Sequence, residues 1–267
     1  MTHNRMRMFW WVGVLGLVAL AACSPATPAG QLVFRANGED FAREGLVSKD
    51  GWAVTFDHVY VTLTDITAYQ TDPPYDAHEG GELTAQAQVE LPGQFTVDLV
   101  TGTADAPPLV GQVEKAPAGH YNAISFRVVP AEEGPSAPHA IVISGSAEKD
   151  GNTVAFSLNV DQAYAFTCGE YVGDARKGIL SADGTADLEM TFHLDHIFGD
   201  ASMPPDDGLN TSAVGFEPFA ALAEDGVLEA DLAMLADRLA PADYEHLSEA
   251  LLSLAHVGEG HCDEQLD

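Results

Sequence analysis

The stretch Val54-Thr-Phe-Asp-His-Val-Tyr-Val-Thr-Leu-Thr-Asp-Ile-Thr-Ala-Tyr69 decides the fold of this chain. β-Branched and aromatic residues fill most of it, and such side chains fit a pleated, half-buried strand. Thr64-Asp65 interrupts the apolar pattern near the middle. The stretch therefore predicts a long extended segment with a local break.

Working outward, similar but shorter stretches follow this segment, and Lys149-Asp150-Gly151-Asn152 is typical of a tight hairpin turn. From Ala186 to Leu194, apolar and polar residues alternate, which predicts a strand with one buried and one wet face. Thr71–Leu91 has no strong period and is expected to be a long exposed loop. Short strands without helical spacers favour a mainly β fold, an antiparallel β-sandwich over residues 31–200. The shorter strands are predicted at Gln94–Leu99, Tyr121–Val129, Ala140–Ser146 and Thr153–Val160.

The pattern changes after Gly199. Leucines recur at helical spacing, and Pro241 is suited to the first turn of a second helix. We therefore expect residues 201–267 to form a helical C-terminal extension packed on the sandwich. The first set of spaced leucines is Leu228, Leu232, Leu235 and Leu239.

The first residues have the features of an export signal. Arg5 and Arg7 precede an apolar run from Phe9 to Leu20, and this run is too short to cross a bilayer as a helix. Leu20-Ala21-Ala22-Cys23 resembles the lipobox of bacterial lipoproteins, in which the cysteine is lipidated and becomes the N-terminus. The resemblance implies a lipoprotein signal peptide over 1–22, a lipidated Cys23 and a tether over 23–30.

A lipidated Cys23 followed by Ser24 favours an extracytoplasmic protein. Such a protein is held at the membrane by its lipid, with the outer membrane, facing the periplasm or the cell surface, as the expected site. The alternative is an ordinary cleaved signal in which the cysteine has no role.

Two of the three cysteines remain once Cys23 is assigned to the lipid, namely Cys168 and Cys262. An oxidising compartment makes a disulfide between them the default expectation. The alternative is a pair of free thiolates that bind a soft metal.

The charge of the chain excludes some partners. The formal net charge is −30, with 11 basic and 41 acidic residues, and no basic cluster is present in the sequence. Such a field repels nucleic acid and concentrates cations near the surface. The sequence also lacks a Gly-x-Ser-x-Gly elbow and a glycine-rich phosphate loop, so we do not expect an enzyme.

Four of the ten histidines fall in two tight groups. His193 and His196 form the first, and His256 and His261 the second. Neutral imidazole is the commonest transition-metal ligand near pH 7, which predicts a site for zinc or copper(II). Residues 193 and 196 would face opposite ways along a flat strand, so the site requires a break at Leu194 or Asp195. The carboxylates expected to ligate or to orient the rings are Asp195, Asp200 and Glu259.

Two other functions are consistent with the same residues. The protein is a structural or interaction module of the cell envelope, with an envelope protein as partner, if the histidines only cap loops. It is a metallohydrolase if the metal keeps an open water position, with Glu259 as the general base.

A resemblance to known proteins rests on three segments, Phe56–Tyr69, Val97-Asp98-Leu99 and Ala116-Pro117-Ala118-Gly119-His120-Tyr121. Together they resemble an uncharacterised bacterial lipoprotein β-sandwich family and, more loosely, the periplasmic copper-binding MbnP-like proteins. The resemblance covers roughly Phe34 to Asp200. It implies extracytoplasmic metal binding without catalysis, and we carry over no ligand residue from that family.

Overall fold

A computed structural model describes residue 1 and residues 27–169, 178–257 and 262–267. The strands are β1 (Ala29–Asn37), β2 (Leu46–Val47), β3 (Ala53–Thr71), β4 (Ala85–Leu91), β5 (Phe95–Asp98), β6 (Leu109–Pro117), β7 (Gly119–His120), β8 (Ala123–Val128), β9 (Ile141–Lys149), β10 (Asn152–Val160), β11 (Tyr164–Gly169), β12 (Ile179–Leu180), β13 (Thr185–Phe192), β14 (Val227–Asp231), β15 (Ala255–His256) and β16 (Cys262–Leu266). The helices are α1 (Glu39–Glu44), α2 (Asp195–Phe198), α3 (Gly208–Ser212), α4 (Glu217–Ala220), α5 (Leu232–Arg238) and α6 (Pro241–Leu252).

Strand β3 is the longest element and the backbone of the larger sheet. It spans 19 residues and pairs with β2, β4, β5, β8 and β9 along its two edges. Its pairing with β8 shifts register between Thr64 and Thr67, where Asp65 has a φ of +52°. The break predicted at Thr64-Asp65 is therefore confirmed as a bulge inside one continuous strand.

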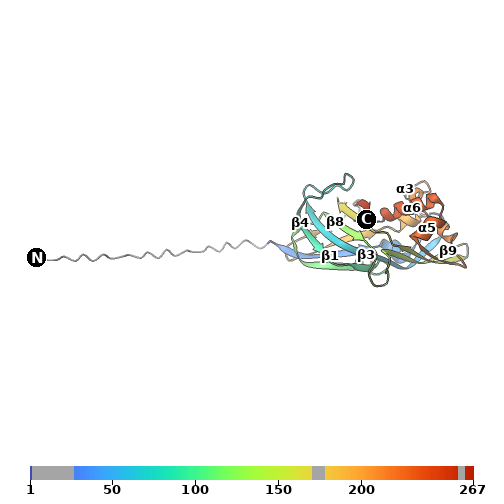
Figure 1. The fold of residues 1–267 in the computed structure, drawn as a ribbon, viewed down its shortest axis with the longest axis horizontal. Coiled ribbons are helices and arrows are strands. Elements are labelled where there is room, and N and C mark those ends of the chain that lie inside the picture. Colours follow the sequence, from blue (N-terminus) through green and yellow to red (C-terminus); the bar gives the residue numbers. More distant parts are fainter. Residues whose placement is uncertain (2–26, 170–177, 258–261) are drawn as a thin grey trace.

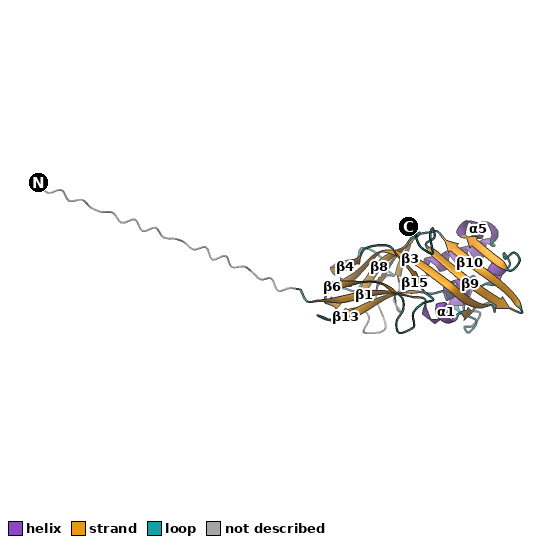
Figure 2. Cartoon of the chain, turned by 90° about the horizontal axis from the view of Figure 1, so that it is seen from below, coloured by secondary structure: helices purple, strands orange, loops and turns teal. Residues whose placement is uncertain are grey.

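Two large sheets form the mainly β, sandwich-like fold, as expected from the sequence, and β7 pairs with β12 in a separate two-stranded sheet. Among the described residues, the smaller sheet has the order β15-β13-β1-β6, and the larger has β14-β10-β9-β3-β8-β11-β16 with β2, β4 and β5 also on β3. Figure 2 shows β6, β1 and β13 side by side, and β9 beside β10. Most strand pairs are antiparallel, as expected, and two pairs are parallel, β1 with β13 and β10 with β14. Parallel partners need long connections, and here other strands lie between the two partners along the chain.

The hairpin between β9 and β10 is confirmed. The two strands pair in unbroken register from Lys149 and Asn152 outward. Asp150 and Gly151 both have positive φ, 52° and 79°, which the tight hairpin turn requires.

Strand β13 differs from the prediction of one wet face. Glu189 and Thr191, which were expected to face water, are 9% and 4% exposed. The strand lies inside its sheet between β1 and β15, and the Glu189 carboxylate accepts a hydrogen bond from Asn37 Nδ2 at 2.9 Å. The polar face is therefore covered over the second half of the strand, whereas the Asp187 side chain nearer its start is 44% exposed.

The C-terminal region is less helical than expected. It contains α3 to α6, which gather on one side of the sheets in Figure 1. It also contributes β14, β15 and β16, which pair with β10, β13 and β11. Leu228 belongs to β14 and not to a helix. It pairs with β10, and this pairing accounts for its buried position. The expected loop 71–91 likewise ends in β4, which pairs with β3.

The disulfide between Cys168 and Cys262 is present. The two residues face each other in the register of β11 and β16, and 94 positions separate them in the sequence. The bond therefore ties the last strand to the larger sheet and closes a long loop of chain.

The predicted signal peptide, Cys23 and most of the tether lie outside the described residues, and β1 begins at Ala29. Within the described ranges, each helix is too short or too polar to span a bilayer.

Loss of the disulfide should lower the stability of the fold. In the chain-entropy view, cross-linking a loop of this length restricts the unfolded chain and contributes about 4 kcal/mol. We expect the Cys168→Ala/Cys262→Ser variant to lose about that free energy of unfolding in urea titrations. Reduced wild-type protein is the control and should unfold at the same midpoint as the variant. An unchanged midpoint for both would contradict the prediction.

Candidate metal centre

The end of β13 places the first two histidines. The strand ends at Phe192, and His193 and Leu194 lead directly into α2. The backbone N–H of His196 donates to the His193 carbonyl at 3.2 Å, so the chain has turned within three residues. Residues three apart on a helical turn lie on one side of it, which brings both rings together. The break that the sequence required at Leu194 or Asp195 is present.

Strand β15 brings the third histidine to the same place. It pairs antiparallel with the end of β13, with Thr191 opposite His256, and the His193 N–H donates to the Leu254 carbonyl at 2.9 Å. Residues 193 and 256 are far apart in the sequence and adjacent in the sheet. The two histidine groups predicted from the sequence therefore meet through His256.

The three imidazole rings are mutually adjacent. The ring centres lie 5.2 Å apart for His193 and His196, 4.8 Å for His193 and His256, and 5.3 Å for His196 and His256. At a metal–nitrogen distance of about 2.0 Å, two imidazoles on one tetrahedral ion have ring centres about 5 Å apart. The spacing of the rings matches that of imidazoles that share one ion.

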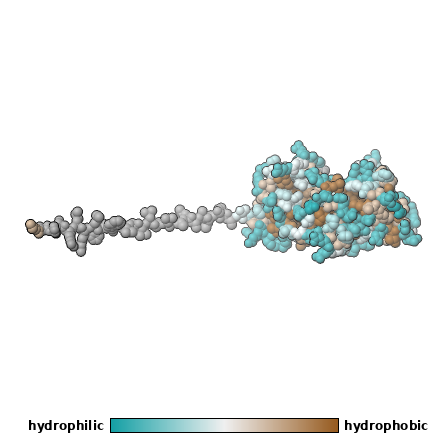
Figure 3. Space-filling model, in the orientation of Figure 1, coloured by the Kyte–Doolittle hydropathy of each residue, from teal (hydrophilic) through white to brown (hydrophobic). Residues whose placement is uncertain are grey.

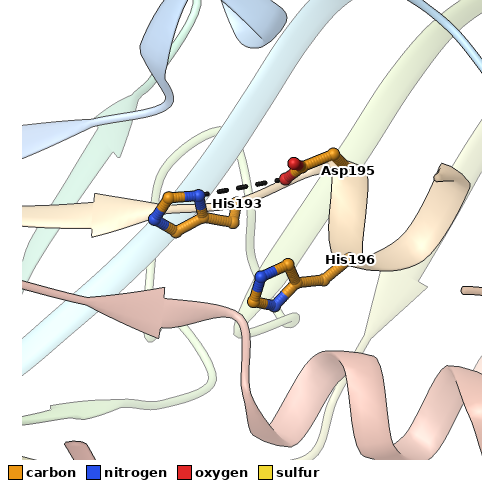
Figure 4. A group of neighbouring side chains, drawn as sticks. All are labelled: His193, Asp195 and His196. Carbon is orange, nitrogen blue, oxygen red and sulfur yellow. Dashed lines mark ion pairs between the residues drawn. The ribbon is translucent and has the colours of Figure 1, made fainter. Parts of the chain in front are cut away.

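A carboxylate lies beside two of these rings. Ligand atoms of His193, Asp195 and His196 all lie within 4.8 Å of one another, and Figure 4 shows the Asp195 carboxylate directed at the His193 ring. His256 adjoins this set by its ring position, and its nitrogen atoms are not within the same mutual distance. Asp195 Oδ1 is 3.9 Å from His193 Nδ1, and among the described residues no donor reaches this buried oxygen within hydrogen-bond distance. A buried carboxylate oxygen of this kind is suited to a cation.

His196 is held in the orientation and protonation state of a metal ligand. Its Nδ1 lies 2.9 Å from the Ser253 carbonyl and therefore donates its proton there. The other ring nitrogen, Nε2, is then the acceptor that could bind an ion. Burial lowers the pKa of His196 below its usual value, and nearby His193 lowers it further. The ring is thus neutral at pH 7.

Glu39 joins this group without any signal in the sequence. Its Oε2 lies 3.4 Å from His193 Nδ1. In the parallel pairing of β1 with β13, Asn37 is opposite Thr191. Two residues further along each chain, Glu39 and His193 therefore lie side by side. The sequence reasoning missed Glu39 because it treated the strands as antiparallel and did not place β1 beside β13.

The other predicted site residues are placed as follows. The Asp200 carboxylate accepts hydrogen bonds from the backbone N–H and the hydroxyl of Ser202, at 2.8 and 2.7 Å, and thereby caps a turn. It is not part of the His193–Asp195–His196 group. Glu259 and His261 lie outside the described residues.

A cavity of about 460 Å³ adjoins the group, with His196 in its wall. Helices α3 and α6 and strand β16 supply the other walls, and Glu249 and Glu264 are its acidic residues. Burial, followed by the neighbouring Asp263, raises the pKa of Glu264 to about 7. One of these carboxyl groups therefore titrates in the neutral range.

No protein-family profile, no curated protein and no solved structure matches this chain. The resemblance to the lipoprotein sandwich family and to the MbnP-like proteins stays a prediction. The site is therefore argued from its own geometry.

Replacing Glu264 by glutamine should stabilise the protein at high pH. The pKa of this group rises from 4.5 to about 7 on folding. Between these values the unfolded chain releases a proton that the folded chain keeps, so stability falls as the pH rises through this window. The shift corresponds to about 3 kcal/mol, and solvent screening of this partly exposed carboxyl leaves about 1–2 kcal/mol.

We expect the free energy of unfolding of Glu264→Gln to exceed that of the wild type by this amount at pH 8 and to equal it at pH 4. Urea titrations at the two pH values measure the difference. Glu245→Gln removes the same charge from an exposed position on α6 and should change neither value. A gain at pH 4 as large as that at pH 8 would contradict the assigned pKa.

Proposed function

We propose that this protein binds one divalent transition-metal ion, zinc or copper(II), at a centre made by His193, His196 and His256. Asp195 is the carboxylate ligand, and Glu39 accepts from or orients the His193 ring. The observation that carries the proposal is the mutual spacing of the three rings, 4.8 to 5.3 Å between centres, which suits a shared ion.

The donor set selects the class of metal. Three imidazoles and a carboxylate favour zinc or copper(II), whereas calcium and magnesium prefer all-oxygen sites. The desolvated, neutral His196 needs no proton loss before binding, and the surrounding carboxylates compensate the charge of the ion. The strongly acidic chain, at −30, also raises the local concentration of cations.

The proposal extends to the place of the protein in the cell. The resemblance of Leu20-Ala21-Ala22-Cys23 to a lipobox supports a lipid-anchored, extracytoplasmic protein. The Cys168–Cys262 disulfide suits an oxidising compartment. Metal storage, sensing or handover at the envelope, without catalysis, fits this combination.

An interaction module without metal is the second candidate function. It is favoured by the contacts of His193 Nδ1 with Glu39 at 3.4 Å and with Asp195 at 3.9 Å, because two carboxylates can hold an imidazole in place without any ion. Metal analysis separates the two functions.

Replacing two imidazoles should abolish metal binding. We expect wild-type protein incubated with zinc and dialysed to retain one ion per chain, measured by elemental analysis. The His193→Asn/His196→Asn variant should bind zinc at least about 100-fold more weakly in calorimetric titrations, since even outer-sphere partners are worth 10–100-fold. Wild-type affinity should also fall in acid, because protons compete with the ion for the imidazole nitrogens.

His120→Asn is the matched control, because His120 is exposed on β7 and remote from the three rings in sequence and sheet. It should bind zinc as the wild type does. Undiminished zinc in the double variant would place the ion elsewhere, and no zinc in the wild type would leave the interaction module as the function.

A further inference from the structure

The edge of the larger sheet at β16 borders two neighbouring cavities. The first, of about 460 Å³, contains Glu264 of β16 in its wall, and the second, of about 250 Å³, contains Leu266. Both cavities share Glu249 and Leu252 of α6. They therefore form two adjacent pockets between α6 and the last strand, and in Figure 3 the outline of the molecule is indented beside the region of α3 and α6.

The two pockets are spaced like alternate residues of an extended strand. Glu264 and Leu266 are two positions apart, so their side chains lie on the same face of β16, about 6.7 Å apart along it. An extended peptide that lies beside β16 repeats with the same spacing. Its alternate side chains would enter the two pockets in turn.

The edge itself is open to pairing. In the part of the chain that the structure describes, β16 pairs with β11 on one side and is the last strand of its sheet on the other. An edge strand presents backbone N–H and C=O groups that can pair with a further strand. Because the disulfide Cys168–Cys262 fixes β16 to β11, the edge is held in place for a partner.

The chemistry of the two pockets differs. The first has the carboxylates of Glu249 and Glu264, in a chain of net charge −30. The second is mostly apolar and includes Leu232, Leu251 and Leu266, of which Leu266 is 66% exposed. The first pocket thus complements a cationic side chain and the second an aliphatic one.

We propose that β16 is a docking edge for an extended peptide segment of a partner protein, which adds as a strand with a lysine or arginine in the Glu249–Glu264 pocket and an aliphatic residue two positions away in the Leu232–Leu251–Leu266 pocket. The inference does not depend on a metal at the histidine centre. It assigns the interaction surface by which an envelope partner of basic and aliphatic character is recognised.

The probe is the peptide acetyl-Thr-Val-Thr-Lys-Thr-Val-Thr-amide, which offers valine on both sides of lysine and so fits either strand direction. We expect it to bind the full-length protein with a Kd below about 1 mM, as measured by chemical-shift titration. Amide hydrogen exchange should slow in β16 when the peptide is bound, which reports strand addition and not mere surface contact. Peptides with lysine replaced by glutamate, or both valines by serine, should bind at least about tenfold more weakly.

The matched protein variants test the pocket directly. Glu249→Gln/Glu264→Gln should weaken binding at least about tenfold while remaining folded, because loss of the Glu264 charge is stabilising near neutral pH. Glu245→Gln lies one turn earlier on α6 and outside the pocket, and it should bind the peptide as the wild type does.

Three outcomes would overturn the proposal. One is no binding at millimolar peptide, and another is binding without protection of β16 amides. The third is concentration-dependent dimerisation that protects β16 without peptide, since the edge would then be an interface between two copies of this chain.

Discussion

The candidate metal centre depends on strand register at one end of the smaller sheet, where the ends of β1, β13 and β15 meet. Parallel pairing sets Asn37 of β1 against Thr191 of β13, and antiparallel pairing sets His256 of β15 against the same Thr191. The chain immediately beyond these positions supplies Glu39 and His193, and the turn into α2 supplies His196. Because side chains alternate faces with a period of two, a shift of one residue in the β1–β13 pairing would displace Glu39 from His193, and a shift in the β13–β15 pairing would turn His256 away from it. The candidate metal centre is thus a consequence of sheet register.

The electrostatics of the centre follow from its position at the end of the sheet and under α6. Burial disfavours charge on His196, while Asp195 and Glu39 lie beside His193 and favour a positive charge between them. In the proposed function, a metal ion would supply that charge without protonation of the imidazoles. The Ser253 carbonyl at the end of α6 accepts a hydrogen bond from His196 Nδ1 and so leaves Nε2 as the nitrogen that would face an ion. The same helix forms the walls of the cavities beside β16, and α6 thereby joins the metal centre to the proposed docking edge.

Local patterns were sufficient to predict several parts of the structure. The bulge at Asp65 and the turn at Asp150-Gly151 depend on residues that tolerate positive φ, and such residues are visible in the sequence. The need for a break after His193 followed from strand geometry alone. The sequence did not predict the covering of the polar face over the second half of β13, the strand β14 at Leu228 or the approach of Glu39. Each of these depends on a partner far away in the chain, and alternation or leucine spacing does not identify that partner.

The amino-acid sequence by itself determined the acidity, and it predicted the mainly β class, a disulfide between Cys168 and Cys262, and four imidazoles as candidate ligands, of which His261 lies outside the described residues. Side-chain type and short-range backbone preference are enough for these features. Only the tertiary structure decided that His256 lies against His193 and His196, that Glu39 joins them while Asp200 caps a turn, and that β16 ends the larger sheet beside two pockets. Strand pairing between distant segments sets these positions. Backbone hydrogen bonds between strands form whatever the side chains are, so the residue types do not show which segments pair.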